Sequence, residues 1–265
     1  MTEGDAPKEN LDDYLKEVLS RKEKYLSEHK EYRKFENLFH RHTAGKYVGD
    51  LIYGANDGII TTFAVVAGAA GASLSAVVVI ILGLANLVAD GFSMGASNYL
   101  GKQSERDYAR AQRKKEEWEI DHLREIEVAE VREIFDKKGF RGRDLARAVE
   151  IVTSDRKVWV DMMMKDELGI IEEERDDPKK HGAATFAAFV VAGFCPLIPY
   201  LLPFDANRFA LSAVFSGMTL FLAGALRSTI TTVSWVRGGL EVLLIGSSAA
   251  LGAYIIGNIV DGIIR

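Results

Sequence analysis

The sequence has few of the residues that mark secreted or nucleotide-binding folds. Its single cysteine, Cys195, excludes a disulfide within the chain. The first 46 residues are polar and show no cleavable signal pattern. There is no glycine-rich phosphate loop and no HExxH motif, and the histidines are scattered. We therefore expect no catalytic residues and do not expect an enzyme.

Charge is absent from two long parts of the chain. Residues 48–100 carry only Asp50, Asp57 and Asp90, and residues 183–265 carry seven charges. Residues 101–182, in contrast, carry 19 basic and 22 acidic side chains. This alternation predicts an all-α membrane protein with a polar insert. The balanced charge of the insert argues against a nucleic-acid surface, which would be strongly basic.

The apolar parts are long enough for five membrane spans, because one span needs roughly 20 residues. The small-residue stretch GAAGAS at 68–73 predicts a tight hairpin between the first two spans, and Pro196, Pro199 and Pro203 are expected to kink or end the third. The spans are expected at about 48–70, 74–98, 183–203, 208–226 and 240–260.

The basic loops all fall on one side of these spans, which by the positive-inside rule is the cytoplasm. The N-terminus and the insert are then cytoplasmic, and the C-terminus lies outside. We expect four parts: an N-terminal arm, spans 1 and 2, an insert, and spans 3 to 5, at residues 1–46, 47–100, 101–182 and 183–265. Within the arm, residues 9–40 predict an amphipathic helix on the membrane surface or on a partner helix, or else a solvated helix.

The insert is expected to hold three helices. Nothing between Gly101 and Gly139 is expected to stop the second span, so it should continue as the first of them and end at Gly139. The stretch RDLARAVEIV predicts a second helix. Ser154 and Asp155 are expected to cap a third, from about 156 to 171.

Polar side chains within the apolar spans are the first candidate site. Asn86, Asp90 and Met94 follow one another at intervals of four residues, so they share one helix face. Asp57 would face them if the first two spans pack together, which the pairs Gly54/Gly58 and Gly91/Gly95 permit. Carboxylate, amide and thioether groups together can hold a divalent cation. The alternative is that Asp57 and Asp90 are structural carboxylates that bridge helices.

A second candidate site lies in the insert. Glu119 and His122 form a Glu-x-x-His pair of the kind used in carboxylate di-iron bundles, and Met162, Met163 and Met164 stand together in a charged helix. The alternatives are a solvated glutamate face and methionines packed in a core. Glutamates also recur at intervals of three residues, at Glu116 and Glu119 and at Glu127, Glu130 and Glu133, and one face of the later helix carries Met163, Met164 and Glu167.

Three stretches together resemble the vacuolar iron transporter (VIT) family of ferrous iron and manganese carriers: YGANDGIITTFAVVAGAAGAS, SMGASNYLGKQSE and VWVDMMMKDELG. The resemblance covers residues 47–262. It implies a five-span homodimer with the ion path at its interface and a cytoplasmic three-helix metal-binding domain. It also implies export of ferrous iron from the cytosol coupled to protons. By position, the resemblance implies that the pathway residues are Asp57 and Met94. It implies seven metal ligands in the insert: Glu116, Glu119, Glu127, Glu130, Met163, Met164 and Glu167.

The chain departs from this family in the second span. Plant and fungal members have a glutamate where this chain has Asn86, and a glycine where it has Asp90. A proline expected in the first span is Thr62 here. The hypothesis is that Asp90 takes over proton exchange.

The resulting expectation is a proton-coupled transporter of ferrous iron, with manganese or zinc as further candidate cargo and no permanently bound cofactor. Expected partners are metal ions, protons, membrane lipid and a second copy of the chain. The membrane would be the cell membrane in a prokaryote and the vacuolar membrane in a eukaryote. The alternative is a membrane-anchored metal sensor or storage-associated protein. An enzyme acting on lipid or oxidised iron would depend on Glu119-x-x-His122 alone.

Overall fold

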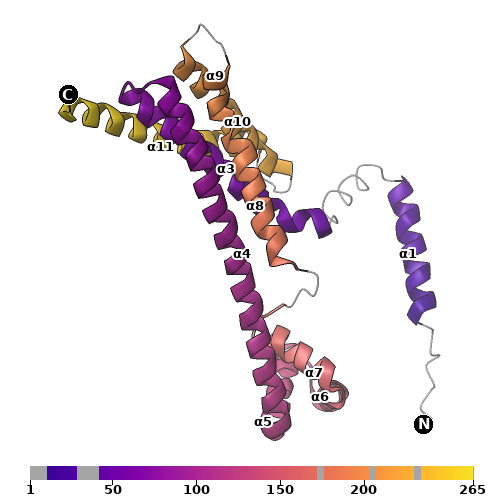
Figure 1. The fold of residues 1–265 in the computed structure, drawn as a ribbon. Helices are drawn as coiled ribbons and strands as arrows, with labels where there is room; N and C mark the ends of the chain where they lie inside the picture. The colour runs from indigo at the N-terminus through magenta and orange to yellow at the C-terminus, as the bar shows by residue number, and fades with distance from the viewer. Residues whose placement is uncertain (1–10, 29–41, 172–175, 203–206, 230–233, 265) are drawn as a thin grey trace, which may run out of the picture. The chain divides into compact units, whose positions relative to one another are not determined.

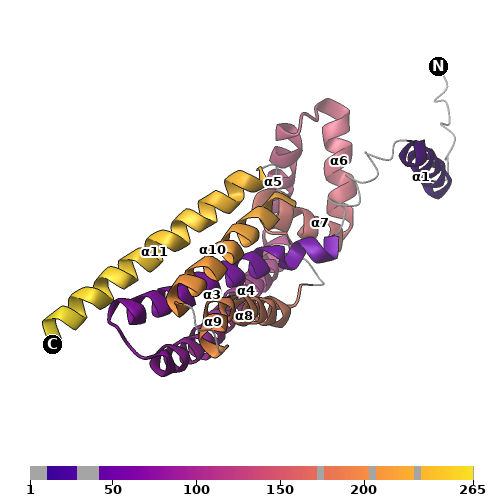
Figure 2. The same cartoon turned by 90° about the horizontal axis from the view of Figure 1, so that it is seen from above.

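The computed structural model describes residues 11–28, 42–171, 176–202, 207–229 and 234–264, and every element in these ranges is a helix. The chain divides into two compact units. The first comprises residues 1–91 and 187–265, and the second comprises residues 92–186. Figures 1 and 2 show the elements of each.

Five helices are long and apolar enough to cross a membrane, as predicted. They lie within α3 (His42–Gly71), α4 (Ala76–His122), α8 with its continuation (Pro178–Leu201), α10 (Arg208–Leu226) and α11 (Trp235–Ile264). The predicted hairpin between the first two is confirmed, although α3 runs on to Gly71. Ser73, in the turn, adopts a left-handed φ of 51°.

The prolines interrupt the third span as predicted. Helix α8 (Pro178–Gly193) stops before Pro196 and is followed by the 3-10 turn η2 (Cys195–Leu197) and the short helix α9 (Ile198–Leu201). Proline removes a backbone donor and clashes with the preceding turn, which explains the break. Pro203 lies outside the described residues.

Close backbone approach holds the first unit together. Helix α11 packs along α3 and α10 (Figure 2), around a core of Ile59, Leu220 and Val242. At Gly257 on α11, an added Cβ would overlap the carbonyl oxygen of Gly68 on α3. Glycine therefore sets the distance between these two helices.

This contact predicts that Gly257→Ala lowers the free energy of unfolding by about 1–3 kcal/mol, because the new methyl group must push two backbones apart. Gly252→Ala on the same helix is the matched control, since a Cβ there meets nothing within 4 Å. Thermal unfolding of both variants in detergent checks this. Equal melting temperatures would show that the α3–α11 contact is not tight.

The second unit begins within α4. Helix α4 has 47 residues and is therefore about 70 Å long, more than twice the roughly 30 Å hydrocarbon core of a bilayer. The last part of α4 therefore extends beyond the membrane, and α5 (Arg124–Lys137), α6 (Gly142–Ser154) and α7 (Arg156–Met162) follow it. The second span does continue into the insert, as predicted.

Three details of the insert differ from the prediction. The helix expected to run unbroken to Gly139 breaks at Leu123, whose φ of −120° and ψ of 33° are not helical. The described part of the insert therefore has one helix more than the three expected. The helix expected to reach residue 171 ends in a π-helical turn, η1 (Met163–Glu167), and Gly169 follows with a φ of 67°.

Two predicted caps of the insert are confirmed. The Asp155 side chain accepts hydrogen bonds from the backbone N–H groups of Lys157 and Val158. Gly139 follows the end of α5 with a left-handed φ of 97°. The predicted helical arm is present as α1 (Leu11–Glu28), and its other predicted residues, 9–10 and 29–40, lie outside the described residues.

Candidate functional site

Three glutamates of the second unit converge on one point. Glu116 and Glu119 lie on α4 and Glu127 lies on α5, and one carboxylate oxygen from each lies within 4.8 Å of the others. Glu116 is 1% exposed and Glu127 is 3% exposed. Glu119 is part-exposed. Three carboxylates this close together, two of them buried, repel one another unless a proton or a cation lies between them.

The break at Leu123 brings these glutamates together. On an unbroken helix, Glu116 and Glu127 would be separated by about 16 Å along the axis. Helix α4 instead ends at His122 and α5 starts at Arg124. The change of direction between them brings the Glu127 carboxylate close to that of Glu116. The Leu123 N–H still bonds to the Glu119 carbonyl, and its own carbonyl accepts from the Glu127 N–H at 3.2 Å.

Burial and mutual repulsion favour the protonated form of these carboxyls. Burial raises the pKa of Glu116 to about 7, with further contributions from Glu167 and Glu119. Burial also raises the pKa of Glu127 to about 7, with help from Glu130 and Glu116. The pKa of Glu167 is raised in turn by burial and by Glu130. All five predicted glutamates therefore share one electrostatic environment.

Two oxygens of this cluster have no hydrogen-bond partner. Oε2 of Glu116 and Oε2 of Glu127 are buried and accept no hydrogen bond within the described part of the chain. An unpaired buried acceptor is costly, so such atoms call for an explanation. A cation bound between the glutamates would satisfy both of them, and hard oxygen ligands suit a divalent ion.

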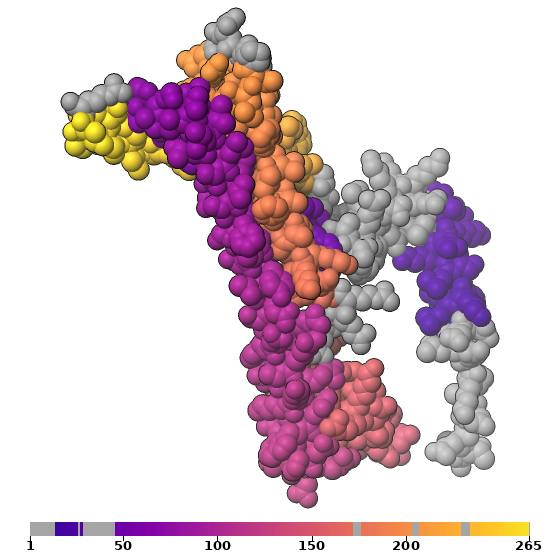
Figure 3. Space-filling model, in the orientation of Figure 1, coloured from indigo at the N-terminus to yellow at the C-terminus, as the bar shows by residue number. Residues whose placement is uncertain are grey.

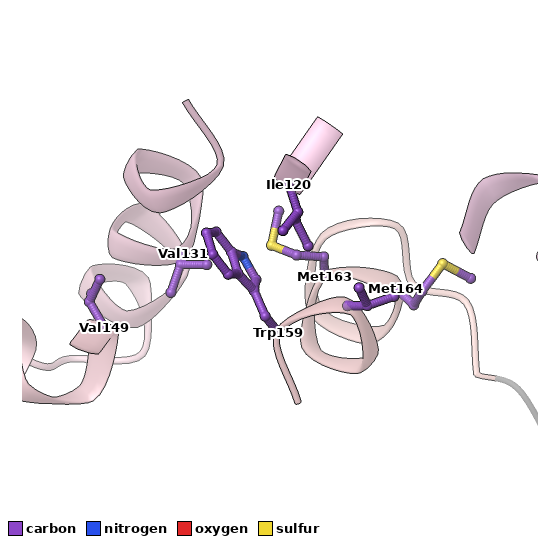
Figure 4. Close-up of a cluster of buried hydrophobic side chains, with 7 residues drawn as sticks. Ile120, Val131, Val149, Trp159, Met163 and Met164 are labelled. Carbon is purple, nitrogen blue, oxygen red and sulfur yellow. The ribbon is translucent and has the colours of Figure 1, made fainter. Parts of the chain in front are cut away.

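The two predicted methionines lie in the core of this unit. Met163 and Met164 are 0% and 2% exposed and begin the π-helical turn η1. Figure 4 shows Met163 pointing toward Ile120 and Met164 pointing away from Trp159. Met162 packs against the same core, so core packing accounts for all three methionines. Short π-helical segments are frequent at functional sites, and η1 also carries Glu167.

His122 is not placed with the glutamates. Its Nδ1 lies 2.8 Å from the Trp118 carbonyl oxygen, and its ring stacks on the Trp118 ring at 4.5 Å. Within the described residues, the Glu-x-x-His pair is therefore not assembled as a di-iron motif. One contributing residue was missed in the sequence: Lys115, whose Nζ lies 3.0 Å from Glu119. Its interval of four residues from Glu119 was the available signal.

Asn86 and the backbone of Asp57 are linked through Thr61. Asn86 on α4 donates to the Thr61 hydroxyl at 3.4 Å, and that hydroxyl donates to the Asp57 carbonyl at 2.8 Å. The first two spans thus meet near Asp57, which is half-buried. Asp90 is exposed. Thr61 was missed because a lone threonine in an apolar span gives no distinctive signal.

Met94 and Asn98 lie further along α4, in the second unit, and both are half-buried. The Asn98 side chain donates to the Thr185 hydroxyl at 2.7 Å, which ties α4 to α8. Asn98 therefore has a structural partner within its own unit.

The small-residue pairs serve a different contact from the one expected. An added Cβ at Gly58 would overlap the Phe189 carbonyl on α8, and one at Gly95 would lie 2.9 Å from the Gly182 carbonyl on α8. Figure 3 shows α8 lying along α4. At Gly58 and Gly95 the close neighbour is thus α8.

The sequence profile of the VIT family matches residues 48–258, which include every candidate site residue. The chain belongs to the VIT family. Vacuolar iron transporter 1 of Arabidopsis thaliana is 35% identical over 223 residues, covering 83% of this chain and 88% of that relative. The vacuolar iron transporter of Toxoplasma gondii (strain ATCC 50861 / VEG) is 34% identical over 84% of this chain and 77% of its own length. That of Plasmodium berghei (strain Anka) is 33% identical, over 89% and 90%.

Within this VIT family member, the raised pKa values predict how stability depends on pH. Glu116 and Glu127 bind protons more tightly in the folded state, with a pKa of about 7, than their ordinary value of 4.5. The stability that they contribute is complete below about pH 4.5 and is lost as the pH rises through about 7. We expect the melting temperature of the metal-free protein to fall over this interval and a divalent metal to restore it at pH 8. A melting temperature that does not respond to metal at pH 8 would contradict this.

Proposed function

We propose that this protein carries ferrous iron out of the cytosol across a membrane, in exchange for protons. The observation that carries the proposal is the cluster of Glu116, Glu119 and Glu127, with its two unpaired buried oxygens, in a VIT family chain with five span-length helices. Its relatives are named as vacuolar iron transporters. Manganese, another oxygen-preferring divalent ion, is the second candidate cargo.

The insert captures the ion. At neutral pH, protons and a divalent cation compete for Glu116 and Glu127, because the pKa of both is about 7. Glu130 and Glu167 add negative charge, and Met163 and Met164, at the start of the turn that carries Glu167, are the proposed soft ligands. A site of this kind concentrates metal on the side of the membrane where the insert lies. The positive-inside rule supports a cytoplasmic location for the insert, because the basic loops lie on the same side of the spans.

The membrane residues carry the ion onward. Asp57 and Met94 ligate it, Asn86 contributes an amide oxygen, and Asp90 exchanges protons for it. Carboxylates at bilayer depth are costly, and in a span they mark ion or proton paths. Asp90 is exposed on the protomer, which suits a path lined by two copies of the chain in a homodimer.

The test is uptake into vesicles that contain the purified protein, with ferrous iron outside, an iron-quenched dye inside, and an imposed pH gradient. We expect quenching that depends on the protein and the gradient, together with proton movement in the opposite direction. A membrane-anchored sensor would bind iron in detergent but give the same quenching as protein-free vesicles, and that result would reject transport.

A further inference from the structure

Two hydroxyl groups of the first unit are buried without a hydrogen-bond partner. They belong to Thr62 on α3 and Ser216 on α10, and both residues are 0% exposed. Within the described part of the chain, neither Oγ1 of Thr62 nor Oγ of Ser216 bonds to any other group. A buried hydroxyl without a partner is destabilising, so both call for an explanation.

Neighbouring hydroxyls on the same helices show the usual solution. A threonine or serine within a helix can donate to the carbonyl four residues before it. Thr61 on α3 donates to the Asp57 carbonyl at 2.8 Å, and Thr219 on α10 donates to the Phe215 carbonyl at 2.7 Å. Since Thr62 and Ser216 do not make this bond, their hydroxyls are available to a group outside their own helices.

Helices α3 and α10 pack against each other in opposite directions (Figure 2). Ile59 on α3 and Leu220 on α10 share one buried core. Further along α3, the ring of Phe63 stacks on that of Phe209 at 6.5 Å. Because Phe209 precedes Leu220 while Phe63 follows Ile59, the two helices are antiparallel.

This arrangement places the two unpaired hydroxyls at nearly the same level. Thr62 lies about 4.5 Å beyond Ile59 along α3, and Ser216 lies about 6 Å before Leu220 along α10. Their levels therefore differ by only about 1.5 Å.

The break in the third span lies at the same junction. The turn η2 contacts both α3 and α10. The buried residues of α10 follow one another at intervals of four: Ser212, Ser216, Leu220 and Gly224. The Ser212 hydroxyl donates to the carbonyl of Pro196 in η2 at 2.7 Å. Ser216 therefore lies between a residue that bonds to η2 and a residue that packs with α3.

Thr62 faces this junction from the side of α3. Gly58, one turn before it, packs against the Phe189 carbonyl of α8. An added Cβ at Gly193, the last residue of α8, would lie 2.7 Å from the Gly58 carbonyl oxygen. Thr62 therefore lies one turn beyond the contact with the end of α8, where η2 begins.

The break also leaves a backbone acceptor without its helical donor. Pro196 has no N–H, so the Ala192 carbonyl lacks the bond that an unbroken helix would supply. Ala192 packs against the core of Ile59 and Leu220. Within a bilayer, carbonyls freed by proline are satisfied by serine or threonine side chains and by ordered water.

A water molecule suits these groups better than a metal ion does. Thr62, Ser216 and Ala192 offer three neutral oxygen atoms, and a buried water typically makes about three hydrogen bonds. A hard cation takes about six or more oxygen ligands. Its charge would also be uncompensated by these groups at bilayer depth, which is costly.

We propose that a buried water molecule bridges the break in the third span. It accepts hydrogen bonds from the Thr62 and Ser216 hydroxyls and donates one to the Ala192 carbonyl. The water thereby connects α3 and α10 to the interrupted span. This proposal does not depend on metal transport.

The first test is thermal unfolding of the detergent-purified full chain carrying Thr62→Val, Ser216→Ala or both. Each single change removes one partner of the water and leaves the others unsatisfied, so each should lower the melting temperature by about 3–6 °C. The double variant should lose no more than the larger single loss, because the two changes disrupt the same site. Additive losses would overturn the proposal, and so would a higher melting temperature of either single variant.

Thr219→Val is the matched control, since the Thr219 hydroxyl bonds to its own helix. Its effect should add to that of Thr62→Val.

The second test is a crystal structure of the wild type that resolves ordered water. We expect a water within about 3.2 Å of both Thr62 Oγ1 and Ser216 Oγ, and none there in the double variant. A direct hydrogen bond between the two hydroxyls, with no water, would overturn the proposal even if the two losses were not additive.

Discussion

Glu116→Gln is expected to stabilise the metal-free protein at pH 8 while weakening its binding of divalent metal. Burial and Glu167 raise the pKa of Glu116 to about 7, so at pH 8 the folded state holds a carboxylate that it disfavours. The glutamine has a similar shape but no charge, which should raise the free energy of unfolding by about 1–3 kcal/mol. It also removes a ligand, which should weaken binding at least about 10-fold. Thermal unfolding at pH 8, with and without ferrous iron, measures both effects.

Glu125→Gln is the matched control for this variant. Glu125 is exposed in the first turn of α5 and makes no contribution to the raised pKa values of the cluster. It should change neither the stability of the metal-free protein nor the shift caused by metal. If Glu116→Gln instead destabilised the metal-free protein at pH 8, Glu116 would be a satisfied structural carboxylate and not a metal ligand.

Asp57→Asn is expected to lower the rate of ferrous iron transport at least about 10-fold while leaving metal binding by the insert unchanged. Asp57 lies within a span, next to the Thr61 hydroxyl that connects it to Asn86 on α4. The asparagine keeps the size of the side chain but cannot neutralise a cation at bilayer depth. Vesicle uptake measures the rate, and metal titration in detergent measures binding.

Two further aspartate variants make this result specific. Asp50→Asn is the matched control, because Asp50 lies on α3 two helical turns before Asp57 and is not part of the proposed path. It should transport at the wild-type rate. Asp90→Asn should still bind iron but should lose the dependence of uptake on the pH gradient. Gradient-dependent uptake by Asp90→Asn would reject Asp90 as the proton exchanger.

Hydropathy predicted the membrane part of the fold well. A bilayer admits only backbone that satisfies its own hydrogen bonds, so five long apolar stretches had to become five helices. The breaks at the Gly71–Ser75 turn and near Pro196 followed from equally local rules. Predictions of this kind need no knowledge of which elements contact each other.

The candidate site was predictable only in part, because its assembly depends on a break that has no local signal. Leu123 is an ordinary helix former, and neither a proline nor a glycine marks the end of α4. We infer that the core around Trp159 and Met163 favours the reversal of the chain there. The glutamates were identified as candidates from their spacing, but the pairing of Glu116 with Glu127 across the break was not.

The same limit explains two contacts that the spacing did not predict. Gly58 and Gly95 carry a spacing that permits close approach, yet spacing does not name the partner helix, which is α8. His122 stands three residues after Glu119, at the last residue of α4, where the ring turns to Trp118.

The most direct test of the account is ferrous iron uptake at saturating iron by vesicles containing wild type, Glu116→Gln or Asp57→Asn. If the insert captures iron and Asp57 passes it through the membrane, Glu116→Gln should approach the wild-type maximal rate while needing more iron to reach it. Asp57→Asn should stay near the rate of protein-free vesicles at every iron concentration. Wild-type uptake by Asp57→Asn would contradict the account.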